Sequence, residues 1–473
     1  MSRTWSRPKI ALAGLLLALF TSAAHGDFPA AKEAKTTTPY PPVEITFMTF
    51  TAPRALRVWS VKIDLNSPDI DFMVTPRGKF DNPKLETAAV TTLDFARAFR
   101  TQVSINATCS EPAPRKGGAG VDIQGLSISL GDIYSLDQGK AGGVVIDTKH
   151  RVSILASPIK TDQLKDVHHG VGGHFLNGVI LAEGKNLVAD NKQTGSAAAL
   201  HPRTAVGLSA DKKTMWWLIV DGRQKQISEG VYLVELAELG KKLGCNELIN
   251  LDGGGSTTLV LQEPKAADWK VINTPVGLGK PGSLRSNGNS IGLYVFTPDR
   301  AITSAQLKAI MPTLTTERLA TFLGPLNRTM WKNDITTPKR RAAFLAQLAH
   351  ESGELKYMEE IASGKAHEGR KDLGNTEPGD GTRYKGRGPI QLTGRANYRA
   401  AGAALGLELE KTPELVARPE IGCLVAGWFW STQKLNDLAE AGDFKQITRR
   451  INGGLNGLKQ REAYHRKALE VFK

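Results

Sequence analysis

The sequence predicts two domains, a mixed α+β domain followed by a mainly α-helical one, and two observations carry this prediction. The chain has 473 residues, more than the roughly 250–300 residues at which single hydrophobic cores usually stop growing. The pattern of residues along the chain also changes at Thr297-Pro298-Asp299. Before this point, short β-like runs alternate with Gly, Asn and Asp turns, and after it helical periodicity dominates. We therefore expect domains at 43–298 and 299–473.

Individual segments support this division. Residues 58–65 and 215–220 have the alternating or apolar pattern of strands, and residues 87–99 and 231–243 have apolar residues at helical spacing. In the second half, helical patterns recur at short intervals: 341–349, 396–405, 421–433 and 464–472.

The first residues indicate export. Basic residues precede the apolar run 10–20, and Ala24-His25-Gly26 offers small residues at a cleavage site. The apolar run is shorter than the roughly 20 residues of a transmembrane helix. We expect 1–26 to be a secretory signal peptide, 27–42 to be a flexible leader, and the mature protein to be periplasmic or secreted with no stable membrane anchor.

Composition narrows the class of partner. Hydrophobic residues make up 41% and charged residues 23% of the chain, as in folded globular proteins. The net charge of +14 favours polyanions. Anionic cell-wall polymer suits an exported protein, whereas nucleic acid is not expected, because no nucleic-acid-binding motif is present.

Cysteine and histidine usage predicts no cofactor. Of the three cysteines, Cys109 and Cys245 are the only pair within one predicted domain, and a disulfide between them is one possibility. His168, His169 and His174 do not have the spacing of a metal site. Whether the first domain uses a metal is left open.

The second domain carries paired carboxylates. An apolar helical stripe from residue 340 onward delivers Glu351 to a helix end at Ser352-Gly353. Glycoside hydrolysis needs one carboxyl group as acid and another as base or nucleophile. A continuous helix would place Glu351 and Glu360 on opposite faces, about 13 Å apart along the axis. A break at Ser352-Gly353 would bring them nearer the roughly 6.5–9.5 Å of inverting hydrolases.

Three blocks in this domain resemble family 19 glycoside hydrolases of the chitinase and endolysin type: HESG at 350–353, YKGRGPIQLTGRANY at 384–398 and INGGL at 451–455. The resemblance implies a mainly α lysozyme-like fold, with Glu351 as general acid, Glu360 as general base and Thr393 orienting the attacking water. It also implies a sugar-binding cleft lined by Gln391, Asn397, Tyr398 and Asn452.

Two points in that assignment stay open. Glu359 and Glu377 are alternatives to Glu360, because the sequence has the short spacing of phage and bacterial lysins rather than the plant insertion. The resemblance implies β-1,4-linked N-acetylhexosamine glycan as substrate, and the short form favours peptidoglycan over chitin.

The strongest motif of the first domain is LINLDGGGSTTLV at 248–260, an apolar strand that ends in an acid and three glycines. Three glycines let backbone N–H groups approach a ligand such as phosphate. A plain tight turn is the alternative interpretation. The motif is not a P-loop, because no Gly-Lys-Ser/Thr follows.

Further clusters accompany this motif: NAT at 106–108, HPRTAVG at 201–207, DGR at 221–223 with SEG at 228–230, and Arg285 through Asn289. Together they resemble the phosphodiester glycosidase family, which implies cleavage of a sugar-1-phosphodiester. By this resemblance Arg203 and Arg285 clamp phosphate, and Asp252 or Glu229 supplies acid/base chemistry, with His201 as an alternative proton carrier. The implied substrate-binding residues also include Asn106, Asn289, Gly253, Gly254, Gly255 and Ser256.

These motifs lead to one functional hypothesis, an exported bifunctional cell-envelope hydrolase. One domain would cut a glycosyl phosphodiester and the other the glycan backbone. The alternative is an antibacterial effector or wall-binding protein, whose first domain only targets the lytic domain to phosphate-rich polymer.

Overall fold

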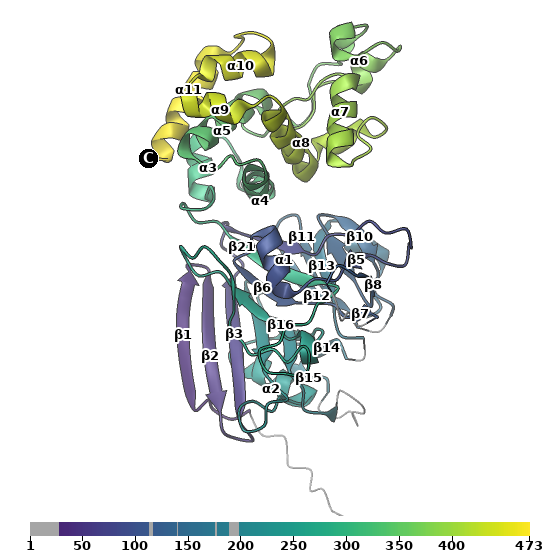
Figure 1. Ribbon diagram of the computed structural model, residues 1–473, viewed down its shortest axis with the longest axis vertical. Helices are drawn as coiled ribbons and strands as arrows, with labels where there is room; N and C mark the ends of the chain where they lie inside the picture. The colour runs from purple at the N-terminus through teal and green to yellow at the C-terminus, as the bar shows by residue number, and fades with distance from the viewer. Residues whose placement is uncertain (1–27, 113–116, 140, 176, 189–197) are drawn as a thin grey trace, which may run out of the picture.

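The computed structural model shows a β-rich domain and a helical domain stacked end to end (Figure 1). The predicted signal peptide lies outside the residues that the structure describes. Those residues are 28–112, 117–139, 141–175, 177–188 and 198–473. None of the helices within these ranges is long and apolar enough to cross a membrane.

The largest sheet has eight strands in the order β1-β2-β3-β17-β16-β18-β14-β15, and all neighbours are antiparallel. Its strands are β1 Glu33–Tyr40, β2 Val43–Phe50, β3 Leu56–Asp64, β14 Val179–Ala182, β15 Lys185–Asn186, β16 Arg203–Leu208, β17 Thr214–Val220 and β18 Glu247–Asn250.

The expectation of a flexible leader at 27–42 is wrong for residues 33–40. These residues form β1, which pairs with β2 from Glu33 opposite Thr49 to Tyr40 opposite Val43. Most of β1 is exposed, so its sequence lacks the apolar alternation that marks a half-buried strand. Pairing with β2 therefore decides its conformation.

Two five-stranded sheets and one three-stranded sheet complete the domain, in the orders β20-β19-β6-β21-β4, β10-β9-β13-β11-β12 and β5-β8-β7. Their strands are β4 Ile70–Val74, β5 Thr87–Ala88, β6 Val103–Asn106, β7 Ser110–Glu111, β8 Gly120–Ile123, β9 Ser127–Ser129, β10 Asp132–Ser135, β11 Gly143–Asp147, β12 Val152–Leu155, β13 Val167–Gly172, β19 Leu259–Leu261, β20 Lys270–Val271 and β21 Ser290–Val295.

Apolar residues from several sheets meet in one core, in which Val61, Ile105 and Trp217 are fully buried. Helices α1 Thr92–Phe99 and α2 Leu233–Leu243 lie against the sheets (Figure 1). Both helices were expected from periodicity, although α1 begins five residues later than the start of its pattern because β5 occupies residues 87–88.

A disulfide between Cys109 and Cys245, which the sequence left open, is not formed, because all three cysteines are free and buried. Cys245 packs in the apolar cluster under α2, whereas Cys109 lies beside Asp252. Burial raises the pKa of both thiols, so both are protonated at neutral pH.

The second domain is built from nine helices within the described residues, and α5 is its buried centre: ten of its fifteen residues are buried. The predicted helical segments fall on α5, α7, α8 and α11. The helices are α3 Ser304–Ile310, α4 Thr316–Lys332, α5 Pro338–Ser352, α6 Asp380–Arg383, α7 Arg395–Leu405, α8 Pro419–Thr432, α9 Leu435–Ala441, α10 Phe444–Asn452 and α11 Leu458–Val471.

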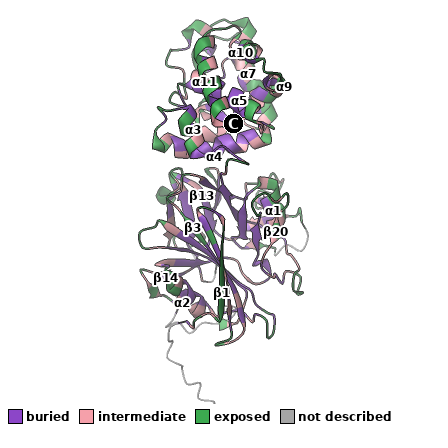
Figure 2. Cartoon of the chain, turned by 90° about the vertical axis from the view of Figure 1, so that its left-hand side faces the viewer, coloured by how far each residue is buried: buried purple, intermediate pink, exposed green. Residues whose placement is uncertain are grey.

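The domains meet through apolar packing and a buried ion network. Phe95, Tyr294 and Phe296 of the first domain belong to the same apolar cluster as the helical core, and Figure 2 shows buried residues on the side of α4 that faces the sheets. Arg328 of α4 contacts both Asp71 of β4 and Glu420 of α8.

Histidines extend this network on the side of the first domain. Nε2 of His150 lies 3.3 Å from Asp71, and Nε2 of His168 lies 3.3 Å from Glu420. Burial by itself would raise the pKa of Asp71, but Arg328 and His150 outweigh it and lower that pKa far below its ordinary value. Asp71 is therefore ionised inside the interface.

Replacing Arg328 with Met tests this network. The variant leaves two buried carboxylates without their shared cation, and we expect it to lower the free energy of unfolding by about 3–5 kcal/mol. Urea denaturation followed by circular dichroism measures the change. Arg151→Met, which removes an exposed ion pair with Asp147, should cost less than about 1 kcal/mol. Equal effects of the two substitutions would contradict a stabilising role for the buried network.

Candidate active sites

The chain reverses direction directly after Glu351. Helix α5 ends at Ser352, and the next three residues, Gly353, Glu354 and Leu355, have φ angles of 57°, 61° and 62°. The predicted helix break at Ser352-Gly353 is therefore confirmed. The Ser352 hydroxyl stabilises the reversal, because it accepts a hydrogen bond from the Leu355 N–H at 2.8 Å.

Glu354 holds this reversal in place from inside the domain. Its carboxylate accepts hydrogen bonds from the Thr313 N–H at 2.7 Å, the Thr313 hydroxyl at 2.6 Å and the Tyr464 hydroxyl at 2.9 Å. A left-handed conformation costs a non-glycine residue roughly 1–2 kcal/mol. These bonds and the complete burial of Leu355 offset that cost.

Glu351 is oriented by a buried arginine. Nη2 of Arg461 donates to the Glu351 carboxylate at 2.6 Å, and Nη1 of Arg461 donates to Gln347 on the same helix at 2.5 Å. Arg461 is almost completely buried, whereas 17% of the Glu351 side chain is exposed. The arginine therefore approaches from the core and leaves the other side of the carboxylate open.

That open side belongs to a cavity of about 660 Å³. Both Glu351 and Glu360 line it, so the structure brings the two predicted carboxylates together. Four further predicted residues line the same cavity: Gln391, Thr393, Asn397 and Asn452.

Glu360 is the carboxylate that accompanies Glu351. Its Oε2 accepts hydrogen bonds from the Gly386 N–H at 3.0 Å and from Nε2 of His367 at 3.1 Å. Glu359 instead contacts Lys385 at 2.9 Å and Arg387 at 3.3 Å, outside the cavity lining. The hydrogen bond from Lys385 lowers the pKa of Glu359. Glu377 is exposed and also lies outside the lining.

The cleft residues after Glu360 are fixed by local hydrogen bonds. The Thr393 hydroxyl donates to the Gln391 carbonyl at 2.9 Å, and Nδ2 of Asn397 donates to the Thr393 carbonyl at 2.7 Å. Nδ2 of Asn452, at the end of α10, is buried and has no protein partner in the described part of the chain. It is a donor available to a ligand in the cavity.

The prediction that Tyr398 lines the cleft is wrong. Tyr398 is completely buried, donates to the Lys385 carbonyl at 2.8 Å and accepts from Arg387 at 3.2 Å. It lies on the inward face of α7, so it supports the segment 385–387 rather than touching a sugar.

In the first domain, Asp252 follows β18 and begins the three-glycine loop. Nη2 of Arg285 lies 3.5 Å from Oδ2 of Asp252 and also contacts the Ser256 hydroxyl. Gly254 has a φ of 60°, and a Cβ there would lie 3.0 Å from the guanidinium of Arg223. Glycine at this position therefore lets the loop and the arginine approach each other.

His201 lies beside two arginines. Nη2 of Arg223 is 3.3 Å from Nδ1 of His201. Burial, followed by the charges of Arg223 and Arg203, lowers the pKa of His201 to about 4, so the ring is neutral at pH 7. Burial also lowers the pKa of Arg203 to about 10. The predicted Arg203, His201, Asp252 and Arg285 thus lie around one loop.

Two predicted ligand residues of the first domain are buried. Asn106 is completely buried, where its Nδ2 donates to the Asp252 carbonyl at 2.6 Å and its Oδ1 accepts from Thr204 at 2.9 Å. Asn289 is also buried and donates to Ser127 at 2.6 Å. Both side chains are inaccessible in this structure, and Oδ1 of Asn289 has no partner among the described residues. Their role in substrate binding stays a prediction.

Glu229 accepts a hydrogen bond on its backbone carbonyl from the N–H of Arg223 at 3.2 Å. Its N–H donates to the Ala55 carbonyl at 3.0 Å, and its charge acts on Arg54. Among the described residues, no hydrogen bond or ion pair joins its carboxylate to Asp252 or Arg285. Nor does any group of three or more His, Cys, Asp or Glu residues there have the arrangement of a metal site.

Two family models match the chain, one in each domain. The family model described as phosphodiester glycosidase matches residues 99–294, and the one described as chitinase class I, glycoside hydrolase family 19, matches residues 329–443. A glycosyl hydrolase family 19 domain-containing protein of Haemophilus influenzae is 35% identical over 154 residues, which cover 26% of this chain and 74% of that protein. The chain belongs to glycoside hydrolase family 19.

Other relatives share less of their length. An endochitinase of Arabidopsis thaliana is 47% identical over 122 residues, which cover 25% of this chain and 41% of that protein. This chain thus spans about two fifths of the length of that plant enzyme. The predicted resemblance of the first domain to phosphodiester glycosidases and of the second domain to family 19 is confirmed.

Two solved structures resemble the separate domains. The catalytic domain of zebrafish N-acetylglucosamine-1-phosphodiester alpha-N-acetylglucosaminidase is 18% identical, with a TM-score of 0.41, and the match covers 56% of this chain and 88% of that chain. Chitinase C from Streptomyces griseus is 25% identical, with a TM-score of 0.31, and the match covers 37% of this chain and 94% of that chain.

Sequence reasoning missed several residues of the sites. His367, Arg370 and Asp372 line the family 19 cavity, and Arg461 orients Glu351. His367 lies in a 3-10 helix of three residues, too short for a periodic pattern, and Arg461 lies 110 residues after its partner, so no local pattern marks either one. The sequence marked Arg223 only as part of the Asp-Gly-Arg motif and gave it no role of its own.

The environment of His201 can be measured directly. We expect its ring to titrate near pH 4 in NMR spectra, well below the ordinary histidine value of about 6.5. Arg223→Gln removes a neighbouring positive charge and should raise the pKa of His201, which stays below the ordinary value because burial remains. Arg151→Gln, an exposed change elsewhere, should leave the titration unaltered. A wild-type pKa near 6.5 would contradict the described packing.

Proposed function

We propose that this chain is an exported bifunctional cell-envelope hydrolase. The helical domain hydrolyses β-1,4-linked N-acetylhexosamine glycan with inversion, and the first domain hydrolyses a sugar-1-phosphodiester. The observation that carries the proposal is that Glu351 and Glu360 line one cavity, while the neighbouring Glu359 is paired with Lys385 and Arg387.

The contacts of the two carboxylates suit different roles. Glu351 gives its proton to the leaving oxygen, and Arg461 then stabilises the carboxylate that remains. Glu360 accepts a proton from water, and the two N–H donors on its carboxylate stabilise the charged form that a base needs. The Thr393 hydroxyl, which donates to Gln391, is left with oxygen lone pairs to orient that water.

Peptidoglycan is the proposed glycan. The peptide carboxylates of peptidoglycan make it anionic, and the chain carries a net charge of +14. The two proposed catalytic carboxylates lie only nine positions apart, the short form that favours peptidoglycan over chitin. The basic, apolar first residues support export to the periplasm or medium.

The first domain is suited to a phosphodiester because arginines surround its acid. Arg285 contacts Asp252 and Ser256, and Arg223 lies against Gly254 and His201. Arginine binds phosphate oxygens through its planar fork of donors. Asp252 is the proposed acid/base group, with neutral His201 as an alternative proton carrier.

Replacing each carboxylate tests the family 19 site. Glu351→Gln and Glu360→Gln should each lower kcat on chitohexaose and purified peptidoglycan by about 10²–10⁴-fold, because each removes a proton-transfer group. Glu359→Gln is the matched control and should keep near wild-type activity. Mass spectrometry follows the products, and NMR of fresh products should show the α-anomer. A β-anomer, or a larger loss in Glu359→Gln than in Glu360→Gln, would overturn the assignment.

A synthetic N-acetylglucosamine-1-phosphodiester tests the first domain. The full chain should release the sugar, and Asp252→Asn should abolish this release while glycan hydrolysis by the helical domain continues. The control is Glu44→Gln, which alters an exposed carboxylate of β2. If the wild type releases no sugar but still binds phosphate-rich wall polymer, the first domain is a targeting module instead.

A further inference from the structure

His367 contacts the carboxylate that the proposed mechanism uses as its base. The residue ends a short 3-10 helix, Lys365–His367. Its Nε2 lies 3.1 Å from Oε2 and 3.3 Å from Oε1 of Glu360. Contact with both oxygens constrains the plane of the carboxylate, and the Gly386 N–H at 3.0 Å constrains it from a second direction.

The other ring nitrogen indicates which atom carries the proton. Nδ1 of His367 is buried and has no protein partner among the described residues. A proton there would be a buried unpaired donor, which costs about 1–3 kcal/mol. Nε2 therefore carries the ring proton and donates it to Glu360.

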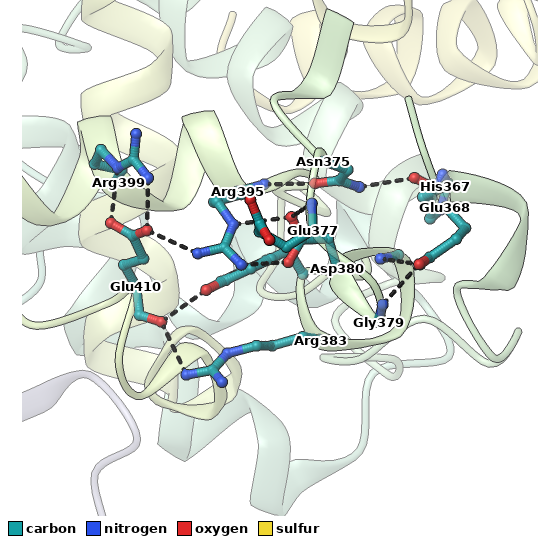
Figure 3. Close-up of polar contacts among 12 residues, drawn as sticks. His367, Glu368, Asn375, Glu377, Gly379, Asp380, Arg383, Arg395, Arg399 and Glu410 are labelled. Carbon is teal, nitrogen blue, oxygen red and sulfur yellow. Dashed lines mark hydrogen bonds and ion pairs between the residues drawn. The ribbon is translucent and has the colours of Figure 1, made fainter. Parts of the chain in front are cut away.

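A polar network holds the segment that carries His367 (Figure 3). Nδ2 of Asn375 donates to the His367 carbonyl at 2.8 Å, and Oδ1 of Asn375 accepts from the Arg395 N–H at 2.8 Å. The carboxylate of Glu368 accepts from the N–H groups of Gly379 at 2.6 Å and Gly381 at 2.8 Å. These bonds hold the segment against residues 375–381 and against the start of α7.

Arg395 anchors this network within the domain. Its Nε donates to Asp380 at 2.9 Å, and its Nη1 donates to Glu410 at 3.1 Å. The hydrogen bond from Arg395 lowers the pKa of Asp380. The same helix, α7, carries Asn397 of the cavity. The position of the imidazole is therefore linked to the wall of the cleft.

The other charged groups facing this pair are already engaged. Lys385 and Arg387 contact the Glu359 carboxylate, although Lys385 also reaches the Glu360 backbone carbonyl at 3.4 Å. At the cavity, Arg370 pairs with Asp372, and Glu351 pairs with Arg461. Among the described residues, His367 is the side chain that donates to the Glu360 carboxylate.

We propose that His367 is a positioning residue for the family 19 reaction, which holds Glu360 in its rotamer and in its charged form while Glu360 receives a proton from water. This inference rests on the proposed role of Glu360 as general base. No group is transferred to or from His367. Its Nε2–H remains in place throughout, and the proton from water ends on Glu360.

The test compares three variants of the full chain on chitohexaose. In His367→Ala we expect kcat to fall about 10- to 100-fold, the size expected for losing a hydrogen bond to a charged group, with KM changed less than about 2-fold. The acid limb of the kcat/KM profile should move to higher pH, because the charged base is less stabilised. His367→Gln keeps an N–H donor and should recover most of both effects. Lys365→Ala, an exposed residue of the same short helix, should match wild type.

Asn375→Ala separates positioning from loop structure. This change removes the bond to the His367 carbonyl but keeps the imidazole. If His367→Ala and Asn375→Ala lose activity alike with an unmoved acid limb, or if His367→Gln does not recover, His367 is only structural and the inference is overturned. Circular dichroism checks that each variant is folded. Retention of full activity by Glu360→Gln would instead overturn the proposed function itself.

Discussion

The reversal of the chain after Glu351 is the constraint on which the helical site depends. Three successive residues, Gly353 to Leu355, have left-handed backbone angles, and the buried carboxylate of Glu354 compensates by binding Thr313 and Tyr464. The reversal places Glu351 and Glu360 on one cavity. A continued helix would have left them on opposite faces.

Partner contacts divide the nearby acids among different tasks. Glu354 is buried and structural, and Glu359 is neutralised by Lys385 and Arg387. Glu351 and Glu360 each have one side held by nitrogen donors and another open to the cavity. Residue type alone does not separate these roles. A glutamate carboxylate can stabilise the fold or take part in the reaction, depending on the groups that surround it.

Neighbouring charges also determine the properties of ionisable groups at the first site and between the domains. Burial, together with the charges of Arg223 and Arg203, lowers the pKa of His201, so a neutral ring lies beside cations suited to phosphate. At the interface, Arg328 is shared by Asp71 and Glu420, which joins a strand of one domain to two helices of the other. Breaking such a buried pair costs far more than breaking an exposed one.

Local sequence by itself determined the two domains, several helices, the break at Ser352-Gly353, and the motifs that hold Glu351, Glu360, Asp252 and Arg285. These features depend on periodicity, on glycine and on short motifs, which neighbouring residues carry.

Tertiary structure decided which residues face the cavities. It selected Glu360 over Glu359, added His367 and Arg461, buried Asn106, Asn289 and Tyr398, and made a strand of residues 33–40. Those outcomes depend on contacts between residues far apart in the chain, such as Arg461 with Glu351 across 110 positions, and no local pattern encodes such partners.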